Sequence, residues 1–270
     1  MCKSISNQSN DSLSVCDSLR TFSNLCGSLR CPLGQQQDAQ EWMNMILDQL
    51  YSGQNEEGEL QIAHYSPFRI DSKTSGECDN CTYHFSKKAT ESMLTLELSE
   101  EQQHTIYSYQ ESDGRLQLAH TNLTTSINEL INIPRLQKGE SCPSCNADQV
   151  ERSTVLNNCS DYLILHLKFF HLSQNWNLYK LMPNLSVKEC IQVEVTDDEL
   201  NKSEIGFKLH SIVLHTGETV TGGHYVSIVK MNNNWFLTND TQINSWIPKK
   251  MFQYENGLEM YPYVLVYKKC

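Results

Sequence analysis

Two Cys-x-x-Cys pairs, Cys78 with Cys81 and Cys142 with Cys145, most strongly constrain how this chain of 270 residues can fold. Each pair brings two thiols to one turn, and two such pairs supply the four thiolates that Zn²⁺ takes in a tetrahedral structural site. Because a long segment separates the pairs, two distant turns must meet, for example at the tips of adjacent hairpins. We therefore predict one structural Zn²⁺ site with these four cysteines as ligands.

Two other interpretations of the cysteine pairs are four free thiols and a redox pair beside a βαβ unit. The surrounding residues show no βαβ pattern, which favours the metal site. The chain has eleven cysteines, but its first ten residues carry no apolar segment of a secretion signal, so we expect no disulfide framework. Five further cysteines are predicted to be small buried residues and not ligands: Cys16, Cys26, Cys31, Cys159 and Cys190.

Charge and hydropathy narrow the classes of partner. The formal net charge is −11, the isoelectric point about 5.3 and the mean hydropathy −0.48. An acidic chain repels phosphate backbones, so we expect no nucleic-acid partner and favour a protein partner with exposed Arg or Lys. The longest apolar stretch, residues 162–172, is too short to span a bilayer and is interrupted by His166 and Lys168. We expect no membrane association and a cytoplasmic and/or nuclear location.

Helical periodicity marks the first part of the chain, and strand-like alternation marks the rest. Helices are predicted over residues 13–25, 38–50 and 126–130, with Asp38 as the N-cap of the second, whose apolar face comprises Ala39, Trp42, Met43, Ile46, Leu47 and Leu50. Strands are predicted over residues 162–170, 191–195, 207–215, 224–231, 235–238 and 261–268, with short strands within 62–98 and loops over 52–59 and 99–121. This order indicates an α+β fold.

A histidine and an asparagine occur at strand ends, in a pattern that suits acid–base chemistry. His224 follows a glycine-bearing loop, residues 217–223, and Asn239 and Asp240 follow the next predicted strand. Such a histidine is accessible enough to act as a general base, and an Asn or Asp on the neighbouring strand can hold its imidazole in one tautomer. This is the orienting part of a Cys-His-Asn arrangement. A histidine in a strand is also commonly structural, and the pattern alone leaves that alternative open.

Together these motifs, in their order along the chain, resemble the catalytic domain of the ubiquitin-specific protease family. The segments that carry the resemblance are Gln36–Trp42, similar to the family's Gln-Gln-Asp box; the two cysteine pairs, similar to its zinc-binding finger tips; Tyr162–Phe170, similar to its Leu-x-x-x-Leu-Lys-Arg-Phe strand; Leu214–Gly217 with Gly223–Ser227, similar to its histidine box; Trp235–Asp240, similar to its Trp-x-x-Phe-Asn-Asp element; and Tyr261–Tyr267, similar to its closing strand. Phe169 stands where the family usually has Arg. The resemblance covers residues 13–269.

The resemblance implies a single papain-like domain of the α+β class with thumb, palm and zinc-bearing fingers. Residues 1–60 would form a thumb truncated at its N-terminus, 61–160 mostly the fingers and 161–270 mostly the palm. It also implies a thiol-dependent deubiquitinase domain whose partners are ubiquitin or ubiquitinated proteins. By the same resemblance His224 is the base, Asn239 orients it, Asp240 assists nearby, and Gly223 and Tyr225 lie beside the C-terminal tail of ubiquitin.

The sequence departs from the family at its nucleophile box, an Asn-x-Cys followed by an aromatic residue and then by Asn-Ser. No such box is recognisable: Cys2 precedes a Lys-Ser-Ile-Ser segment, and Cys16, Cys26 and Cys31 also have other neighbours. We therefore expect a catalytically impaired homologue or a truncated fragment, without the attacking thiolate and part of the oxyanion stabilisation. Two alternatives stay open: an active deubiquitinase that uses Cys2, an upstream Cys box or a thiolate from another chain, and a zinc-stabilised scaffold for protein interactions.

Asp38 and Glu41 are predicted to contact the tail of ubiquitin. They lie three residues apart on one predicted helix, so both carboxylates point to the same side. The resemblance places this helix beside a tail that carries arginines, and a carboxylate can bind Arg through a strong charge-assisted hydrogen bond. The alternative is that Asp38 only caps the helix and that Glu41 is a solvated surface charge.

Overall fold

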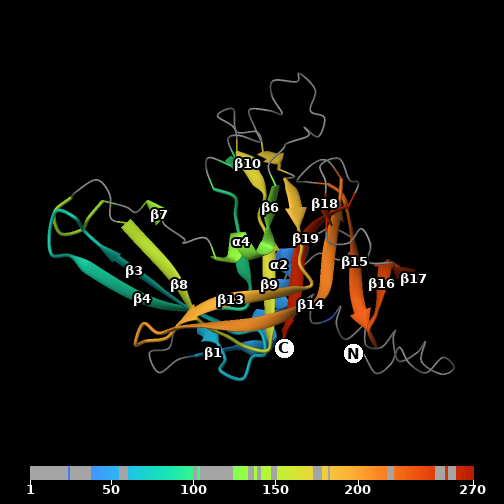
Figure 1. Cartoon of the computed structure of the whole chain (residues 1–270), viewed down its shortest axis with the longest axis horizontal. Coiled ribbons are helices and arrows are strands. Elements are labelled where there is room, and N and C mark those ends of the chain that lie inside the picture. The colour runs from blue at the N-terminus through green and yellow to red at the C-terminus, as the bar shows by residue number, and fades with distance from the viewer. Residues whose placement is uncertain are drawn as a thin grey trace, which may run out of the picture. The chain divides into compact units, whose positions relative to one another are not determined.

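The computed structural model describes residues 24, 38–54, 60–99, 102–103, 124–132, 137–138, 141–146, 151–172, 178–181, 183–217, 222–246, 253–254 and 260–270 (Figure 1). They divide into two compact units, residues 1–49 and 50–270, and each is described by itself. Apart from Asn24, which is helical, the helix predicted over 13–25 lies outside the described residues, as does most of the loop predicted over 99–121. The predicted limits of thumb, fingers and palm stay predictions.

The first unit contains most of helix α2, Ala39–Tyr51. The helix begins where predicted, because the Asp38 carboxylate accepts hydrogen bonds from the backbone N–H groups of Gln40 at 2.8 Å and Glu41 at 3.1 Å. Leu47 is buried, as its place on the apolar face predicts. Leu50 was predicted to share that face, but it is 53% exposed because it lies in the last turn of the helix, beyond the buried stripe.

The second unit consists mostly of strands. In chain order its elements after α2 are β1 Ser52–Gln54, β2 Leu60–Ile62, β3 Ile70–Glu77, β4 His84–Glu91, β5 Leu94–Leu96, β6 Thr124–Ser126, α4 Ile127–Asn132, β7 Gln137–Lys138, β8 Glu151–Cys159, β9 Tyr162–Leu167, β10 Phe170–Leu172, β11 Leu178–Lys180, β12 Asn184–Ser186, β13 Cys190–Thr196, β14 Lys202–Thr216, β15 His224–Met231, β16 Asn234–Asn239, β17 Gln242–Trp246, β18 Gln253–Tyr254 and β19 Met260–Lys269. The helix predicted over 126–130 is found as α4 over 127–132. The predicted strands after residue 160 are confirmed, except that the strand predicted over 162–170 is interrupted at residues 168 and 169, between β9 and β10.

An eight-stranded central sheet carries the histidine and asparagine of the candidate site. Its order is β17-β16-β15-β14-β19-β9-β5, with β13 also paired to β14, and only β5 and β9 pair in parallel. Alternate residues of β9, namely Leu163, Leu165 and Leu167, point to one side of the sheet and belong to its buried cluster. Helix α4 contributes Ile127, Leu130 and Ile131 to the same buried cluster as Leu165, Phe207, Ile212, Ile228, Leu265 and Tyr267. The core therefore supports the strands from which the site residues project.

Two bulges interrupt the long pairing of β14 with β19. Between Leu209 and Ser211 the extra residue is on β14, and between Val213 and Leu214 the extra residue, Tyr263, is on β19. A bulge re-aims the side chain that it inserts. The Tyr263 ring lies 5.6 Å from that of Tyr225, between ring centroids, and so β19 contributes an aromatic side chain beside the start of β15.

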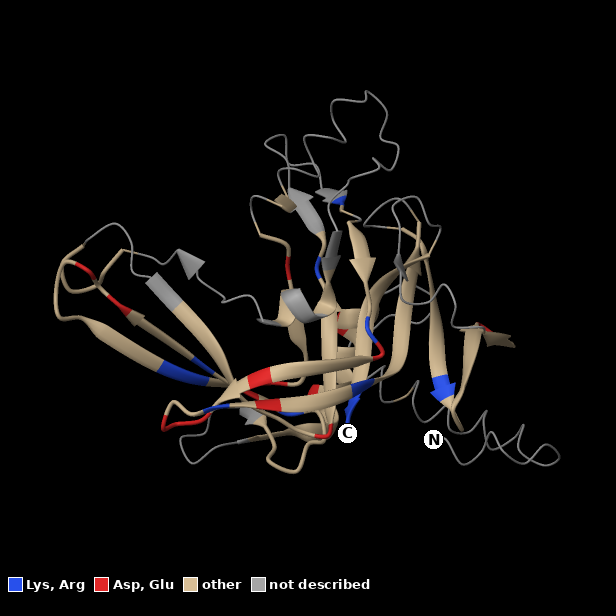
Figure 2. Cartoon of the chain, viewed as in Figure 1, with Lys and Arg blue, Asp and Glu red and all other residues tan. Residues whose placement is uncertain are grey.

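A separate four-stranded antiparallel sheet, of order β4-β3-β8-β7, carries the cysteine turns. The turn between β13 and β14 reaches this sheet through an ion pair, in which Lys88 Nζ lies 2.8 Å from Asp198 Oδ2. In Figure 2 both β13 and β14 carry an acidic segment, and β14 also carries basic segments. One such pair joins Lys202 on β14 to Glu194 on β13 at 2.8 Å. Both residues of these pairs are exposed, so each pair contributes little to stability.

Two further sequence predictions are corrected by the structure. Residues 52–54 were predicted as part of a loop, but they form β1, which pairs with β2 in a small hairpin whose residues 55–59 lie outside the described part. Cys190 was predicted to be buried, yet it is exposed, because β13 alternates and the first residue of the strand points away from the core. None of the helices in the described residues is long and apolar enough to cross a membrane.

Candidate active site and metal centre

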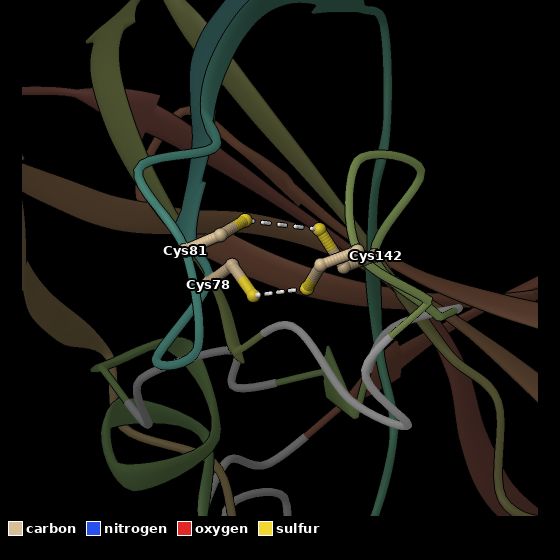
Figure 3. A group of neighbouring side chains, drawn as sticks. Cys78, Cys81 and Cys142 are labelled. Carbon is tan, nitrogen blue, oxygen red and sulfur yellow. Dashed lines mark hydrogen bonds between the residues drawn. The ribbon is translucent and has the colours of Figure 1, made fainter.

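Four cysteine thiols from two distant turns meet in the second unit. Cys78 and Cys81 follow β3, whereas Cys142 and Cys145 lie between β7 and β8. The Sγ atoms of Cys78 and Cys145 are 3.6 Å apart, those of Cys81 and Cys142 are 3.7 Å apart, and all four lie within 4.8 Å of one another. Figure 3 shows the thiols pointing toward one another from two loops. Sulfurs about 2.3 Å from Zn²⁺ at the corners of a tetrahedron are about 3.8 Å apart, so the cluster has the dimensions of a zinc site.

Backbone N–H groups in each turn point at a thiol. Ser144 donates to Cys142 Sγ and Tyr83 donates to Cys81 Sγ, both at 3.4 Å. Asn146 adopts a left-handed φ of 56°, and its N–H closes the second turn on the Cys142 carbonyl at 2.8 Å. Burial opposes ionisation of the Cys142 thiol, but hydrogen bonds from the backbone and from the neighbouring cysteines outweigh it and lower the pKa to about 7. The lowered pKa favours the thiolate, which is the form that binds a metal.

Cys159 provides a contrast with the cluster. It is fully buried at the end of β8 as predicted, and burial raises the pKa of its thiol to about 12. A thiol in this environment stays protonated and behaves as a small apolar side chain. Cys16, Cys26 and Cys31 lie outside the described residues.

His224 and Asn239 lie in direct contact at one end of the central sheet. His224 is the first residue of β15 and Asn239 is the last of β16, and these strands pair with Ser227 opposite Thr238. The His224 Nε2–H donates to Asn239 Oδ1 at 2.7 Å. Asp240 Oδ2 lies 3.8 Å from the same nitrogen. The backbone of Asp240, at the start of the turn to β17, has a φ of 50°. The structure therefore brings together His224, Asn239 and Asp240, the three residues that the sequence predicted to lie at one site.

This geometry determines which ring nitrogen can do chemistry. Because the amide oxygen of Asn239 can only accept a hydrogen bond, it holds the imidazole proton on Nε2. Nδ1 then carries the lone pair and can take a proton from a thiol or water. The His224 side chain is 46% exposed, so a reacting group can reach it. Among the residues that the structure describes, no thiol hydrogen-bonds to His224, and the prediction that Cys2 or an outside cysteine supplies one falls outside the described part.

Gly223 and Tyr225 flank His224. A Cβ atom at position 223 would lie 2.0 Å from the Thr216 carbonyl oxygen and 2.4 Å from His215 Nε2, so only glycine fits there. The Tyr225 ring packs on the His215 ring with centroids 4.8 Å apart. Both predicted residues therefore adjoin His224, while their contact with a ubiquitin tail stays a prediction.

Asp38 and Glu41 belong to the first unit. Asp38 caps α2, as the capping alternative requires, and Glu41 is exposed in the first turn. Their recognition of a ubiquitin tail also stays a prediction.

Lys180 is a residue of this region that the sequence analysis missed. Its Nζ lies 2.9 Å from His215 Nδ1 and 3.1 Å from the Gly217 carbonyl oxygen. His215 is buried on β14 at the base of the loop that precedes His224. A single lysine between Tyr179 and Leu181 gives no signal of such a contact. The only sequence signal is the place of His215 in the segment that resembles the family's histidine box.

The sequence model of the family Ubiquitin carboxyl-terminal hydrolase matches residues 3–267. The chain therefore belongs to this family. Ubiquitin carboxyl-terminal hydrolase 4 of Arabidopsis thaliana is 24% identical over 99 residues, which are 37% of this chain and 27% of the relative. Ubiquitin carboxyl-terminal hydrolase 10-B of Xenopus laevis is 27% identical over 134 residues, which are 45% of this chain and 16% of the relative.

Solved structures share the fold. The SAGA DUB module Ubp8/Sgf11/Sus1/Sgf73 bound to monoubiquitin contains a chain that matches 87% of this chain over 49% of its own length, with a TM-score of 0.61 and 19% identity. The module bound to ubiquitin aldehyde contains a chain that matches 87% of this chain over 50% of its own length, with a TM-score of 0.60 and 19% identity. The chain thus spans about half of these structural relatives and a smaller part of the two sequence relatives.

Proposed function

We propose that this chain is a ubiquitin-recognising domain of the deubiquitinase type, in which His224 and Asn239 are the base and its orienting residue. The observation that carries the proposal is the 2.7 Å hydrogen bond from His224 Nε2 to Asn239 Oδ1 in a chain that belongs to the ubiquitin carboxyl-terminal hydrolase family. Two facts support ubiquitin as the partner: the family, and the structural relatives with ubiquitin or ubiquitin aldehyde bound.

In this proposal His224 acts through Nδ1. A thiol placed near Nδ1 would lose its proton to the imidazole, and Asn239 would hold the resulting imidazolium in place. Asp240 would add negative charge near the imidazolium, although at 3.8 Å it does not hydrogen-bond the ring. No Cys box is recognisable in these 270 residues, so we expect ubiquitin binding without turnover from this chain alone.

We further infer that the cysteine cluster holds a structural Zn²⁺. Four thiolates within 4.8 Å of one another would fill all four positions of a tetrahedral Zn²⁺, which is the arrangement of a structural and not a catalytic zinc site. Cys78, Cys81, Cys142 and Cys145 would hold the ion, and its contribution would be to tie the β3–β4 turn to the segment between β7 and β8. The four-stranded sheet would then correspond to the family's fingers, and the central sheet to its palm.

Two separate groups of residues are proposed to contact the ubiquitin tail: Asp38 and Glu41 in the first unit, and Gly223 and Tyr225 in the second. Asp38 and Glu41 offer carboxylates to the arginines of the ubiquitin tail, and Gly223 offers backbone without a side chain, where a glycine of the tail can pass. Asp38 already accepts two backbone hydrogen bonds through Oδ1, so capping of the helix holds its carboxylate in place. Glu41 is exposed and therefore accessible to a partner.

Calorimetry with ubiquitin and with ubiquitin that lacks its last residues tests the proposal. We expect full-length ubiquitin to bind, and removal of the tail to weaken binding. Asp38→Asn and Glu41→Gln should weaken it as well, more strongly at low salt, because screening reduces charge attraction. Asp48→Asn removes the same charge from α2 about two turns beyond Glu41 and serves as the matched control. Absence of ubiquitin binding by the folded, zinc-loaded chain would refute the proposed function; unchanged affinity in the two variants would refute only the acidic tail site.

A further inference from the structure

Lys180 and His215 contact each other beside the candidate site. Lys180 Nζ lies 2.9 Å from His215 Nδ1 and 3.1 Å from the Gly217 carbonyl oxygen. A lysine ammonium can only donate hydrogen bonds, so His215 Nδ1 must carry the lone pair and the ring proton must lie on Nε2. The ammonium thereby fixes both the tautomer and the plane of the His215 ring.

The opposite edge of the His215 ring faces the backbone that leads into His224. A Cβ atom at position 223 would lie 2.4 Å from His215 Nε2, so Gly223 and the ring are in close contact. The same ring packs on Tyr225 with centroids 4.8 Å apart. His215 therefore contacts the residues on both sides of His224, and any rotation of its ring must move one of them.

These contacts connect three strands. Lys180 ends β11, which pairs with β10, whereas His215 lies near the end of β14 and His224 begins β15. Thr216 and His224 are opposite residues in the pairing of β14 with β15. A continuous chain of contacts therefore runs from Lys180 through His215 and Gly223 to His224, whose Nε2 hydrogen-bonds Asn239.

The surroundings of Lys180 are unusual for a surface lysine. Burial lowers the pKa of its ammonium to about 8, and within the described residues it forms no ion pair with a carboxylate. Its donors go to a ring nitrogen and to a backbone carbonyl. An ammonium held in this way fixes the position of its partners, but burying its charge costs folding free energy. The exposed pair of Lys202 with Glu194 has no such cost.

We propose that Lys180 and His215 are positioning residues that orient His224 through Gly223. They act by fixing the backbone on which His224 lies, and neither touches the His224 ring in the described contacts. The role of His224 as a base rests on the proposed function. The orientation of His224 by Lys180 and His215 does not rest on the proposed function, because this orientation depends only on contacts within the second unit.

The test observes the His224 ring itself. Two-bond ¹H–¹⁵N spectra report the tautomer of each imidazole, and the His224→Gln variant assigns the signal. At pH 7.5 we expect the wild-type His224 to be the Nε2–H tautomer with a protected Nε2 proton, because Asn239 Oδ1 accepts from Nε2. In Lys180→Met we expect loss of that protected proton and ¹⁵N shifts that move toward the average of two tautomers.

Matched variants separate positioning from general damage. Lys202→Met removes an exposed lysine and should leave the His224 signal unchanged. His215→Phe keeps a ring against Gly223 but removes Nδ1, and it should reproduce the effect of Lys180→Met. The effects of substitutions at residues in one chain of contacts do not add. The double variant of Lys180→Met and His215→Phe should therefore shift the His224 signal no further than either single variant. An unchanged His224 signal in folded Lys180→Met would overturn the proposal, and so would additive shifts.

Two further measurements keep the outcome decisive. If Lys180→Met does not fold, the wild-type His215 must still show the Nε2–H tautomer, and the Nδ1–H tautomer would overturn the inference. Ubiquitin binding is measured on the same samples. If the His224 signal responds as expected but the wild-type chain does not bind ubiquitin, the proposed function fails while the positioning role stands.

Discussion

The side-chain oxygen of Asn239 lies 2.7 Å from Nε2 of His224, which leaves Nδ1 as the ring nitrogen that can accept a proton. Asp240 lies 3.8 Å from the same Nε2 atom, beyond hydrogen-bond distance. The two residues are therefore not equivalent: Asn239 fixes the ring, and Asp240 contributes only its charge. Asn239 and Asp240 both lie at the β16–β17 turn. The pairing of β15 with β16 therefore sets the positions of His224 and Asn239 relative to each other before any substrate is present.

We expect no measurable hydrolysis of ubiquitin C-terminal esters or amides by this chain alone. Loss of the nucleophile from a catalytic unit costs on the order of 10⁶-fold in rate. A fluorogenic ubiquitin amide measures the residual activity. Turnover that disappears in Cys2→Ser but persists in Cys190→Ser, which alters an exposed cysteine on β13, would identify Cys2 as the nucleophile and contradict this expectation.

The cysteine cluster predicts a zinc stoichiometry of about one ion per chain. Cys142→Ser should lower the zinc content and destabilise the β3–β4 and β7–β8 turns, because binding of a structural zinc is worth on the order of 10 kcal/mol of folding free energy. Elemental analysis and thermal unfolding measure the two effects. Cys190→Ser is the control and should keep the metal. Full zinc content in Cys142→Ser would exclude a site shared by the four cysteines.

The cap of α2 predicts a difference between two substitutions of Asp38. Asp38→Ala removes the acceptor of the Gln40 and Glu41 N–H groups and should lower the free energy of unfolding by about 1 kcal/mol. Asp38→Asn retains an acceptor oxygen and should change it by no more than a few tenths of a kcal/mol. Urea unfolding followed by circular dichroism measures both. Equal losses in the two variants would show that the negative charge, and not the cap, stabilises the helix.

The close contact at Gly223 predicts a further stability difference. In Gly223→Ala the new methyl group would meet the Thr216 carbonyl and the His215 ring, so the backbone must shift, at a cost of about 1–3 kcal/mol. Gly53→Ala is the matched control: no atom of the described residues lies within 4 Å of its Cβ position, and its effect should stay within about 0.5 kcal/mol. Thermal unfolding compares the two variants. A Gly223→Ala chain as stable as Gly53→Ala would contradict the tight contact.

The central strands could be predicted from sequence because their patterns are strong. β15 occupies the predicted residues 224–231, where turn residues bound an alternating segment on both sides. Between β15 and β16, Asn232 and Asn233 take φ values of 48° and 64°, which suit a tight two-residue hairpin and explain the asparagine-rich turn signal. β9 was predicted from a nearly continuous apolar run, and five of its six residues are buried between neighbouring strands.

Other elements could not be predicted because their sequences are polar and their stability comes from neighbours. β8 reads Glu-Arg-Ser-Thr-Val-Leu-Asn-Asn-Cys and is held between β3 and β7 by ladder hydrogen bonds. β17 is an edge strand whose first four residues are exposed. The contact of Lys180 with His215 joins residues 35 positions apart and depends on how β10 and β11 pair. Strand propensity depends strongly on such context, and no local pattern encodes it.

Lys180 predicts a stability that rises with pH between about 8 and 10.5. Burial lowers the pKa of this ammonium in the folded chain to about 8 from the ordinary 10.5. Below pH 8 both the folded and the unfolded chain hold the proton, and the cost of burying the charge is fully present. Between the two pKa values the unfolded chain binds more protons, so the free energy of unfolding increases with pH.

The comparison of wild type with Lys180→Met isolates this contribution, because all other titrating groups are shared. Urea unfolding at pH 7, 8, 9 and 10 gives the difference in unfolding free energy between the two chains. Since part of the lysine remains in contact with solvent, screening reduces its effect, and we expect the difference to shift in favour of the wild type by about 1 kcal/mol over this range. Lys202→Met, which alters an exposed lysine, is measured in parallel as the control for the loss of a lysine side chain. Parallel curves for the wild type and Lys180→Met would mean that the ammonium is as well solvated in the folded chain as in the unfolded one, and the close hydrogen bond to His215 would then not persist in solution.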